Sequence, residues 1–194
     1  MTNEPTSPCR EQPAASPIVL EPVTADDAPL VADVAVRAYN DHYTHLWFDE
    51  GTWYVTKCFT PVVLREDISH PNHRYYLILV DQQPVGFVKL KIDQPLPGFE
   101  SFNALELERI YIERAATGQG VGRTVMEQVT DIARQYGKEL IWLKAMDSST
   151  LAIAFYRQSG FELCGTHQLS FPQMKPEYHG MVIMKKEILP RSNQ

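Results

Sequence analysis

The sequence has few cysteines, no long apolar run and no excess of positive charge, and each shortage excludes a class of protein. The three cysteines among 194 residues, Cys9, Cys58 and Cys164, match no CxxC or zinc-ligand spacing, so we expect structural thiols. No apolar run approaches the ~18 residues that a membrane-spanning helix needs. Lys and Arg number 18 against 24 Asp and Glu, and the net charge of -6 argues against a nucleic-acid surface and is compatible with a cationic small substrate.

The N-terminal residues 1–17 lack both a basic start and an apolar stretch, so we expect no secretory signal and a cytoplasmic protein. Their prolines lie among small polar residues, a composition that cannot offset the entropy lost on ordering. The remaining composition, 44% hydrophobic and 22% charged overall, is ordinary for a globular domain with one core. The predicted organisation is a disordered arm over 1–17, one domain over 18–189 and a tail over 190–194.

The spacing of apolar residues predicts strands that alternate with helices. A helix follows the cap candidates Thr24 and Asp26, and the aromatic-rich stretch 39–73 is typical of short helices joined by loops. The six histidines show no HExxH or comparable pattern, so no metal is expected. The later expected elements are a hairpin over 75–92, a loop over 94–103, a strand over 105–112, a helix over 121–136, a strand over 139–146, a helix over 151–158 and strands over 161–171 and 179–188.

The predicted strand LELERIYI carries two carboxylates, Glu106 and Glu108. In an ideal strand both lie on one face with Ile110 and Ile112, and Leu105, Leu107, Arg109 and Tyr111 lie on the other. A bulge in this strand would separate the roles of the two carboxylates.

A glycine-rich link, TGQGVG, joins this strand to the long helix. Its glycines at 118, 120 and 122 permit backbone conformations closed to other residues, and the N–H groups of the loop and first helical turn have no intrahelical acceptor. With the positive end of the helix dipole, these groups would make a pyrophosphate cradle. The alternative is a turn that only tightens the link. Arg123 breaks the dinucleotide fingerprint GxGxxG, and no Lys-Ser/Thr pair makes a P-loop.

The succession LERIYI, TGQGVG, a helix, ELIWLKA and SSTLAIAFYRQSGF resembles the core of the GNAT superfamily of acyl-CoA-dependent N-acetyltransferases over about residues 75–188. The ending AxxFYxxxGF, from Ala152 to Phe161, is part of that resemblance. Within the superfamily, the residues LERIYI and the strand that contains IWL are most similar to bacterial spermidine/spermine-type acetyltransferases. The resemblance implies a single α/β (α+β) domain with a mixed, mostly antiparallel central sheet flanked by helices.

The resemblance also implies acetyl-CoA as co-substrate, with its pantetheine arm along the strand backbone and its pyrophosphate on the glycine-rich loop. Tyr156 matches the tyrosine that protonates the departing CoA thiolate; the alternative is a packing residue. Thr117 and Ser149 replace the Gln or Arg and the Asn common in the family, and Arg114 or Arg123 would supply the missing charge. The implied cofactor-binding residues are Ile110, Tyr111, Ile112, Thr117, Gly118, Gln119, Gly120, Val121, Gly122, Arg123 and Ser149.

A primary amine with a pKa near 10.4 is only about 0.04% neutral at pH 7, which costs roughly 4.6 kcal/mol before it can attack a thioester. Glu108, ahead of Glu106, is the candidate base, acting directly or through water. The alternative is a solvated strand face on which the two carboxylates pair with Lys89 or Lys91 of the neighbouring strand.

We therefore predict an enzyme that moves an acetyl group from acetyl-CoA to a primary amine, a polyamine or another small amine. Asp41, Asp49 and Glu50 would bind a second ammonium of a polyamine; the alternative is an ordinary surface over an aromatic core. The aromatic faces for the acceptor would come from Trp47, Trp53 and Tyr54. The rival readings are a catalytically silent CoA-binding module, a scaffold without a CoA site, and an acetyltransferase for an amino acid, a peptide N-terminus, an antibiotic or a toxin. A homodimer stays open, because dimers are the commonest closed assembly.

Overall fold

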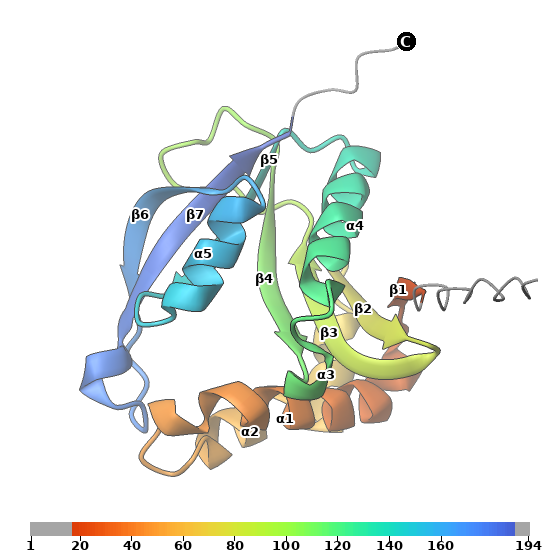
Figure 1. Cartoon of the computed structure of the whole chain (residues 1–194), viewed down its shortest axis with the longest axis vertical. Helices are drawn as coiled ribbons and strands as arrows, with labels where there is room; N and C mark the ends of the chain where they lie inside the picture. Colours follow the sequence, from red (N-terminus) through yellow and green to blue (C-terminus); the bar gives the residue numbers. More distant parts are fainter. Residues whose placement is uncertain (1–16, 189–194) are drawn as a thin grey trace, which may run out of the picture.

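Helices cover both faces of a seven-stranded sheet in the computed structural model, which describes residues 17–188 (Figure 1). The predicted arm, apart from Pro17, the predicted tail and Cys9 lie outside the described residues. The strands are β1 (Ile18–Pro22), β2 (His73–Val80), β3 (Gln83–Lys91), β4 (Ala104–Ile112), β5 (Leu140–Met146), β6 (Glu162–Gln168) and β7 (Gly180–Glu187). The helices are α1 (Ala28–Tyr43), α2 (Thr52–Cys58), α3 (Pro61–Ile68), α4 (Val121–Gln135) and α5 (Thr150–Gln158).

The sheet is mixed, with the strand order β1-β2-β3-β4-β5-β7-β6. Every neighbouring pair is antiparallel except β4 and β5, which are parallel. This arrangement confirms the predicted α/β fold with a mostly antiparallel central sheet. Strand β6 is an edge strand with mostly exposed side chains.

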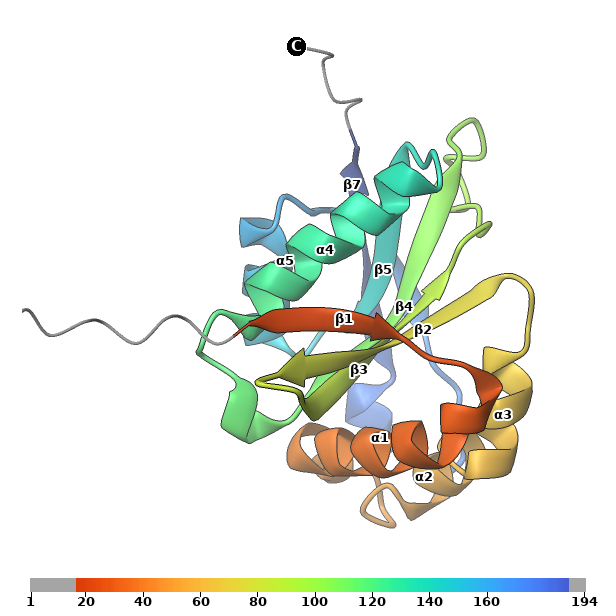
Figure 2. The same ribbon diagram turned by 90° about the vertical axis from the view of Figure 1, so that its right-hand side faces the viewer.

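Two apolar clusters hold the helices against the sheet. On one face, α4 and α5 pack on β3, β4 and β5, with Val125 and Val129 of α4 fully buried. On the other face, α1, α2 and α3 pack through Val31, Val34 and Leu64, which are also fully buried. Figure 2 shows α4 and α1 on opposite sides of the sheet. The apolar residues of α1 and α4, which recur at helical spacing in the sequence, therefore face the strands.

Turn residues end the elements close to where the sequence places their ends. Gly137 and Gly160 follow α4 and α5 with φ of 64° and 89°, the left-handed conformation that glycine adopts without a steric cost. The β2–β3 hairpin turns at Asp81 and Gln82, both with positive φ. No helix of residues 17–188 is both long enough and apolar enough to cross a bilayer.

A bulge in β4 reverses the direction of the side chains in the second half of the strand. The register of β3 and β4 shifts between Lys89 and Leu90, which leaves Glu108 as an extra residue in β4. Beyond the bulge, Ile110 packs into the core under α4, and Arg109 turns to the face covered by α1 and α3.

The expectation that Arg109 and Tyr111 share a face with Leu105 and Leu107 is therefore wrong. Strict alternation holds only in an uninterrupted strand, and the extra residue shifts it by one position. As a result, the two carboxylates before the bulge and the guanidinium after it lie on the same face of the sheet.

Candidate active site

Strands β4 and β5 separate after a short parallel contact and leave a cleft between them. Only three residue pairs join them, from Ala104 opposite Leu140 to Glu106 opposite Trp142. Beyond that point β5 continues to pair with β7, while the open edge of β4 has no strand beside it. Residues of α1, α2, β4, β5 and α5 line a cavity of about 310 Å³ in this cleft.

Five of the residues predicted to act in catalysis or to bind the cofactor line this cavity. They are Glu108, Ile110, Tyr111, Ser149 and Tyr156. They come from two segments about forty residues apart, the second half of β4 and α5 with its N-cap residue Ser149. The parallel pairing of β4 with β5 brings the two segments together, because α5 follows β5 directly.

The main chain of β4 presents polar groups to the cleft edge. Glu113 N–H bonds to Val85 O on the β3 side at 2.8 Å, so by the alternation of an antiparallel pair the groups of Ile110 and Ile112 point away from β3. The Ile112 carbonyl lies 2.9 Å from His42 Nε2 of α1. Ile110 is therefore the residue whose main chain stays open toward the cleft, while the Ile112 carbonyl already has a side-chain contact.

The glycine-rich loop forms an open cradle at the start of α4. Gly118 and Gly120 have φ of 77° and 82°, and a Cβ at either position would meet nothing within 4 Å. Within residues 17–188, the structure records no acceptor for the main-chain N–H groups from Gly118 to Arg123; the next one, that of Thr124, bonds to Gly120 O. These free donors lie at the positive end of a helix of 15 residues. The loop therefore suits a phosphate-bearing ligand.

The side chains around this loop are mostly engaged with its own backbone. Thr117 donates to Arg114 O at 2.7 Å, and Gln119 donates to Ala115 O at 2.9 Å. Arg114 is held by Asp41, which accepts its main-chain N–H at 2.7 Å. Arg123 is 84% exposed and pairs with Glu127 one turn along α4. Of the two arginines considered as sources of the missing charge, only Arg123 has a side chain free to turn toward the loop.

Tyr156 lies on the α5 side of the cleft, half-buried among aromatic rings. Its ring packs against Phe155 and Phe161, with centroids 5.3 and 5.9 Å away. Burial, followed by the neighbouring Tyr43, raises the pKa of Tyr156 above its usual value. The hydroxyl therefore stays protonated at neutral pH and can donate a hydrogen bond into the cleft.

The two predicted base candidates belong to a buried chain of ion pairs. Glu108 contacts Lys89 and Lys91, both at 2.9 Å, and Glu106 contacts Lys91 at 3.2 Å and Lys144 at 3.1 Å. Glu106 is 1% exposed and does not line the cavity, whereas Glu108 does. The alternative of a solvated strand face thus names the right lysine partners but not the right environment, because Glu106 is buried and the Glu108 side chain is only 19% exposed.

The charge of Glu108 is stabilised by its cationic neighbours. Burial alone would raise the pKa of Glu108, but Arg109, Lys89 and Lys91 outweigh burial and hold this pKa below its usual range. At the far end of this series of ion pairs, Asp67 contacts Lys89 at 2.6 Å and His73 at 2.9 Å and accepts a hydrogen bond from Tyr75. Glu108 is therefore ionised at neutral pH, as a proton acceptor must be.

Aromatic side chains form the wall of the cleft on the α1–α2 side. The Tyr39 ring stacks on Tyr43 and Tyr54 with centroids 5.1 and 4.9 Å away, and Trp47 donates to the Tyr39 hydroxyl at 2.6 Å. Phe171, from the loop after β6, closes the wall against Trp47. Of the three aromatics predicted for the acceptor side, Trp47 and Tyr54 line this cavity and Trp53 does not.

The acidic residues considered as an ammonium site serve the backbone instead. Asp49 accepts the main-chain N–H of Trp53 at 2.7 Å and so holds the start of α2, and Asp41 holds Arg114. Glu50 is exposed with a φ of 57°. None of the three lines the cavity between β4 and β5.

Arg109 is a cleft residue that the sequence reasoning did not select. Its guanidinium lies 5.3 Å from the centre of the Phe59 ring and 3.7 Å from Glu108 Oε1, and its side chain is 13% exposed. An arginine next to a carboxylate in a predicted strand was the available signal. Strict alternation assigned it to the opposite face, so the bulge concealed its place in the site.

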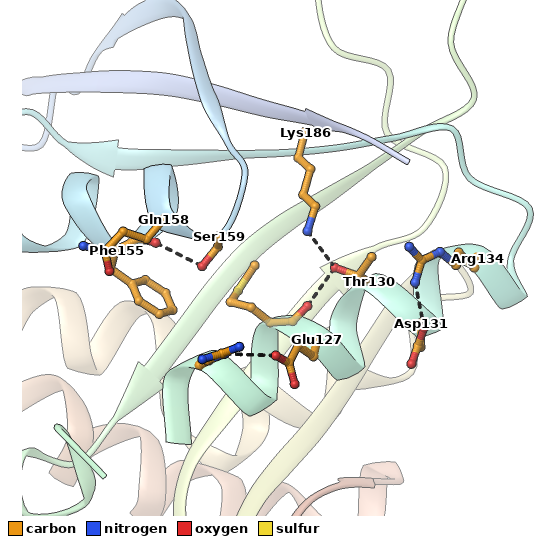
Figure 3. Close-up of a pocket in the computed structure, with 10 residues that line it drawn as sticks. Glu127, Thr130, Asp131, Arg134, Phe155, Gln158, Ser159 and Lys186 are labelled. Carbon is orange, nitrogen blue, oxygen red and sulfur yellow. Dashed lines mark hydrogen bonds and ion pairs between the residues drawn. The ribbon is translucent and has the colours of Figure 1, made fainter. Parts of the chain in front are cut away.

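A second hollow of about 720 Å³ lies beside the cradle, between α4, α5 and β7 (Figure 3). Figure 3 shows Lys186 reaching across to Thr130 and Arg134 paired with Asp131. Arg123 is the only predicted site residue in its lining. None of the candidate catalytic residues lines this hollow, whereas Glu108 and Tyr156 line the cleft. Residues 17–188 contain no group of three or more potential metal-binding side chains.

Known proteins provide a family and a fold for this arrangement. A model described as the acetyltransferase (GNAT) family matches residues 33–161. An uncharacterized N-acetyltransferase of Lactobacillus delbrueckii subsp. lactis is 28% identical over 101 residues, which cover 52% of this chain and 58% of that protein. Streptothricin acetyltransferase of Streptomyces lavendulae is 35% identical over 85 residues, 41% of this chain and 45% of that protein. The chain thus spans about half the length of these curated relatives.

The solved structure of the PaiA N-acetyltransferase from Thermoplasma acidophilum in complex with coenzyme A has the same fold. Its TM-score is 0.69 at 19% identity, and the match covers 88% of this chain and 99% of that one. At this identity the likeness concerns the arrangement of helices and strands.

Proposed function

The chain belongs to the acetyltransferase (GNAT) family, and from this premise we propose that it moves an acetyl group from acetyl-CoA to a primary amine of a small molecule by direct attack in a ternary complex. The observation that carries the proposal is the cradle: main-chain donors from Gly118 to Arg123 without recorded acceptors in the described chain, at the start of α4 and next to the open edge of β4. Exposed donors at a helix start favour an anionic ligand, and the open edge of β4 beside them favours a ligand with an extended arm.

The residues present fit coenzyme A in kind. The N–H groups of 118–123 would hold the diphosphate, the main chain of Ile110 to Ile112 would hold the pantetheine arm, and Ser149 and Thr117 offer hydroxyls nearby. Because His42 contacts the Ile112 carbonyl, we expect Ile110 to make the main-chain contact with the arm. When bound, acetyl-CoA supplies the acetyl group as a thioester.

Two side chains of the cleft would handle the protons. Glu108, held ionised by Lys89, Lys91 and Arg109, accepts the proton that the amine loses as its bond to the acetyl carbon forms, directly or through water. Tyr156, held protonated by burial, donates a hydrogen bond and then a proton to the departing sulfur. The overall reaction therefore gives an amide and a free thiol, and the proton balance closes through solvent.

Placing the two substrates side by side would contribute a large part of the rate. The aromatic wall of the cleft excludes water from the acceptor, which makes the neutral amine easier to form. Glu106, buried behind the cleft, would act by holding Lys91 and Lys144 in place.

The acceptor is the open part of this proposal. A polyamine, as in spermidine/spermine-type acetyltransferases, is the acceptor favoured by the sequence. A homodimer and a cytoplasmic location also stay predictions of the sequence. The cavity of about 310 Å³ is at the small end of ligand pockets, which favours a small acceptor.

The experiment is a screen of amines with acetyl-CoA in which free thiol is measured, together with calorimetric titration of CoA. We expect CoA to bind and at least one amine to release thiol in step with amide formation. Binding without turnover of any amine would instead indicate a silent CoA-binding module. Absence of CoA binding would contradict the cradle.

A further inference from the structure

Arg109 is a buried cation whose hydrogen-bonding capacity is unused in the described part of the chain. The guanidinium has five N–H donors, and residues 17–188 provide no hydrogen bond to it: its recorded contacts are Glu108 Oε1 at 3.7 Å and the Phe59 ring. The side chain is 13% exposed and lines the cleft. Leaving a buried charged donor without a partner is costly, so the position is suited to a ligand that accepts hydrogen bonds.

The charges around Arg109 leave a net positive charge on the acceptor side of the cleft. The ion-pair chain consists of Lys89, Lys91, Arg109 and Lys144 against Asp67, Glu106 and Glu108. Each of the three carboxylates already contacts at least one ammonium at 3.2 Å or less. Arg109 is therefore the cation of this group that remains without a close counter-ion, and Lys57 adds a further positive charge to the lining.

The neighbours of Arg109 extend this anion site. The Tyr54 and Tyr111 hydroxyls lie near enough that the guanidinium lowers their pKa values, although burial raises both on balance. Protonated phenols and a guanidinium are all hydrogen-bond donors, and a planar guanidinium matches a carboxylate in two parallel bonds. A second ammonium of a polyamine would meet repulsion here.

We propose, as a refinement that rests on the acetyl transfer proposed above, that the acceptor is an amine carrying a carboxylate on a neighbouring carbon, an α-amino acid, and that Arg109 binds this carboxylate. The bulge places Glu108 and Arg109 on the same face with charged groups 3.7 Å apart. An α-amino acid presents an ammonium and a carboxylate separated by one carbon. The ammonium would meet Glu108, which takes its proton, while the carboxylate meets Arg109.

Binding of the ammonium by Glu108 and of the carboxylate by Arg109 would account for the two side chains lying next to each other in the cleft. The nitrogen must lie beside the base and within reach of the thioester, and the carboxylate then fixes its orientation. A site whose guanidinium is left unpaired by an uncharged analogue discriminates strongly against that analogue. The distinction from a polyamine therefore rests on one side chain and can be measured.

The test uses the full chain and matched probes: N-acetyl-α-amino acids, which are the products, their uncharged amides, and N-acetylspermidine. Calorimetry in the presence of CoA should show that the best acid binds at least tenfold more tightly than its own amide. In Arg109→Gln this preference should disappear, and in Arg109→Lys it should be partly retained. CoA affinity should be the same in all three proteins, and Arg65→Gln, an exposed arginine of α3, serves as the matched control.

Equal affinity for acids and amides, or tighter binding of N-acetylspermidine, would overturn the inference. A loss of CoA affinity in Arg109→Gln would overturn it as well, because the arginine would then bind the acyl donor. If Arg109→Gln does not fold, the comparison of acids with amides on the wild-type chain and on Arg109→Lys decides alone. The turnover screen separates the two proposals. Acid-selective binding without turnover contradicts the acetyl transfer but not the anion site, whereas turnover of amines regardless of a carboxylate contradicts only the anion site.

Discussion

The two halves of the cleft are built from different parts of the chain. The half that we propose binds the cofactor, the cofactor half, is made of backbone from one continuous segment, the end of β4, the glycine-rich loop and the first turn of α4. The half that we propose binds the amine, the acceptor half, is made of side chains from α1, α2, β4, β5 and the loop after β6. A backbone site needs little more than the right conformation at a few residues, whereas a side-chain site needs distant segments to be placed together.

The two halves also differ in charge. The cradle offers uncharged N–H groups strengthened by a helix dipole, while the acceptor half holds a buried chain of ion pairs with an excess of cations. We expect the cradle to bind the same ligand in any sequence that keeps the loop. We expect one substitution to change the ligand of the acceptor half, so the specificity for the acceptor would reside there.

The largest effect should follow from filling the cradle. Gly120→Val adds a branched side chain at a φ of 82°, where nothing now lies within 4 Å, and should lower CoA affinity by more than about 100-fold, roughly 3 kcal/mol. Gly98→Val is the matched control, since Gly98 has a φ of 85° and equally open surroundings in the loop before β4. Calorimetry with CoA measures both. Full affinity in Gly120→Val would show that the cradle does not bind the cofactor.

The next effect tests which carboxylate of the acceptor half takes the proton. Glu108→Gln should lower kcat by about 100-fold, the usual contribution of a general base, with CoA affinity unchanged. Glu106→Gln, the matched variant behind the cleft, should cost roughly 3 kcal/mol of stability, because Lys144 loses its carboxylate partner and Lys91 keeps only Glu108, and should lower kcat far less. Steady-state kinetics and thermal unfolding distinguish the two. The reverse pattern would move the base to Glu106.

Tyr156 lies in the cleft on the α5 side, and removal of its hydroxyl should lower kcat but leave the affinity for CoA unchanged. Tyr156→Phe keeps the ring packing on Phe155 and Phe161 and should lower kcat by about tenfold, because the departing sulfur loses a proton donor. Tyr136→Phe, at the end of α4, is the control and should leave kcat unchanged. If kcat is the same in Tyr156→Phe and the wild type, the tyrosine only packs.

The smallest effect concerns the far end of the ion-pair chain and depends on pH. Burial alone would raise the pKa of Asp67, but Lys89, Tyr75 and His73 outweigh it and hold this pKa below its usual value near 3.9. The carboxylate therefore contributes stability that is fully present above about pH 4 and is lost as the pH falls through the lower, folded-state pKa.

Thermal unfolding from pH 7 to pH 3 should show this contribution. The melting temperature of Asp67→Asn should fall by about 2–4 °C less than that of the wild type over this range, which corresponds to roughly 1 kcal/mol in a domain of this size. Asp26→Asn, an exposed residue, should follow the wild-type curve. An identical acid response in Asp67→Asn would mean that the ion pairs of this carboxylate contribute nothing to stability.

Much of the cofactor half could be predicted from local patterns. The loop from Gly118 to Gly122, its neighbouring strand and helix, and Tyr156 within AxxFYxxxGF are each encoded in a short run of residues. Periodicity also predicted the order of strands and helices. These features depend on interactions between residues a few positions apart, which a sequence displays directly.

The acceptor half was predicted poorly for the opposite reason. The bulge at Glu108 turned Arg109 into the cleft, although alternation assigned it elsewhere. Asp41 and Asp49 are carboxylates of the kind that bind an ammonium, yet both accept hydrogen bonds from main-chain N–H groups instead. A carboxylate bonds to whichever donor the fold brings closest, and no local pattern states which donor that is.

Local residue patterns were sufficient to predict the strand, glycine-rich loop and helix that form the cradle, because main-chain donors at a helix start depend only on the residues that shape the loop. Which charges meet beside the cradle depends on the packing of distant segments. One extra residue in β4, the divergence of β4 from β5, and the packing of α1 and α2 across the opening place the Glu108 carboxylate and the Arg109 guanidinium in one buried cavity. Electrostatic interactions act through space and strengthen with burial, so their partners are set by the fold and not by distance along the chain.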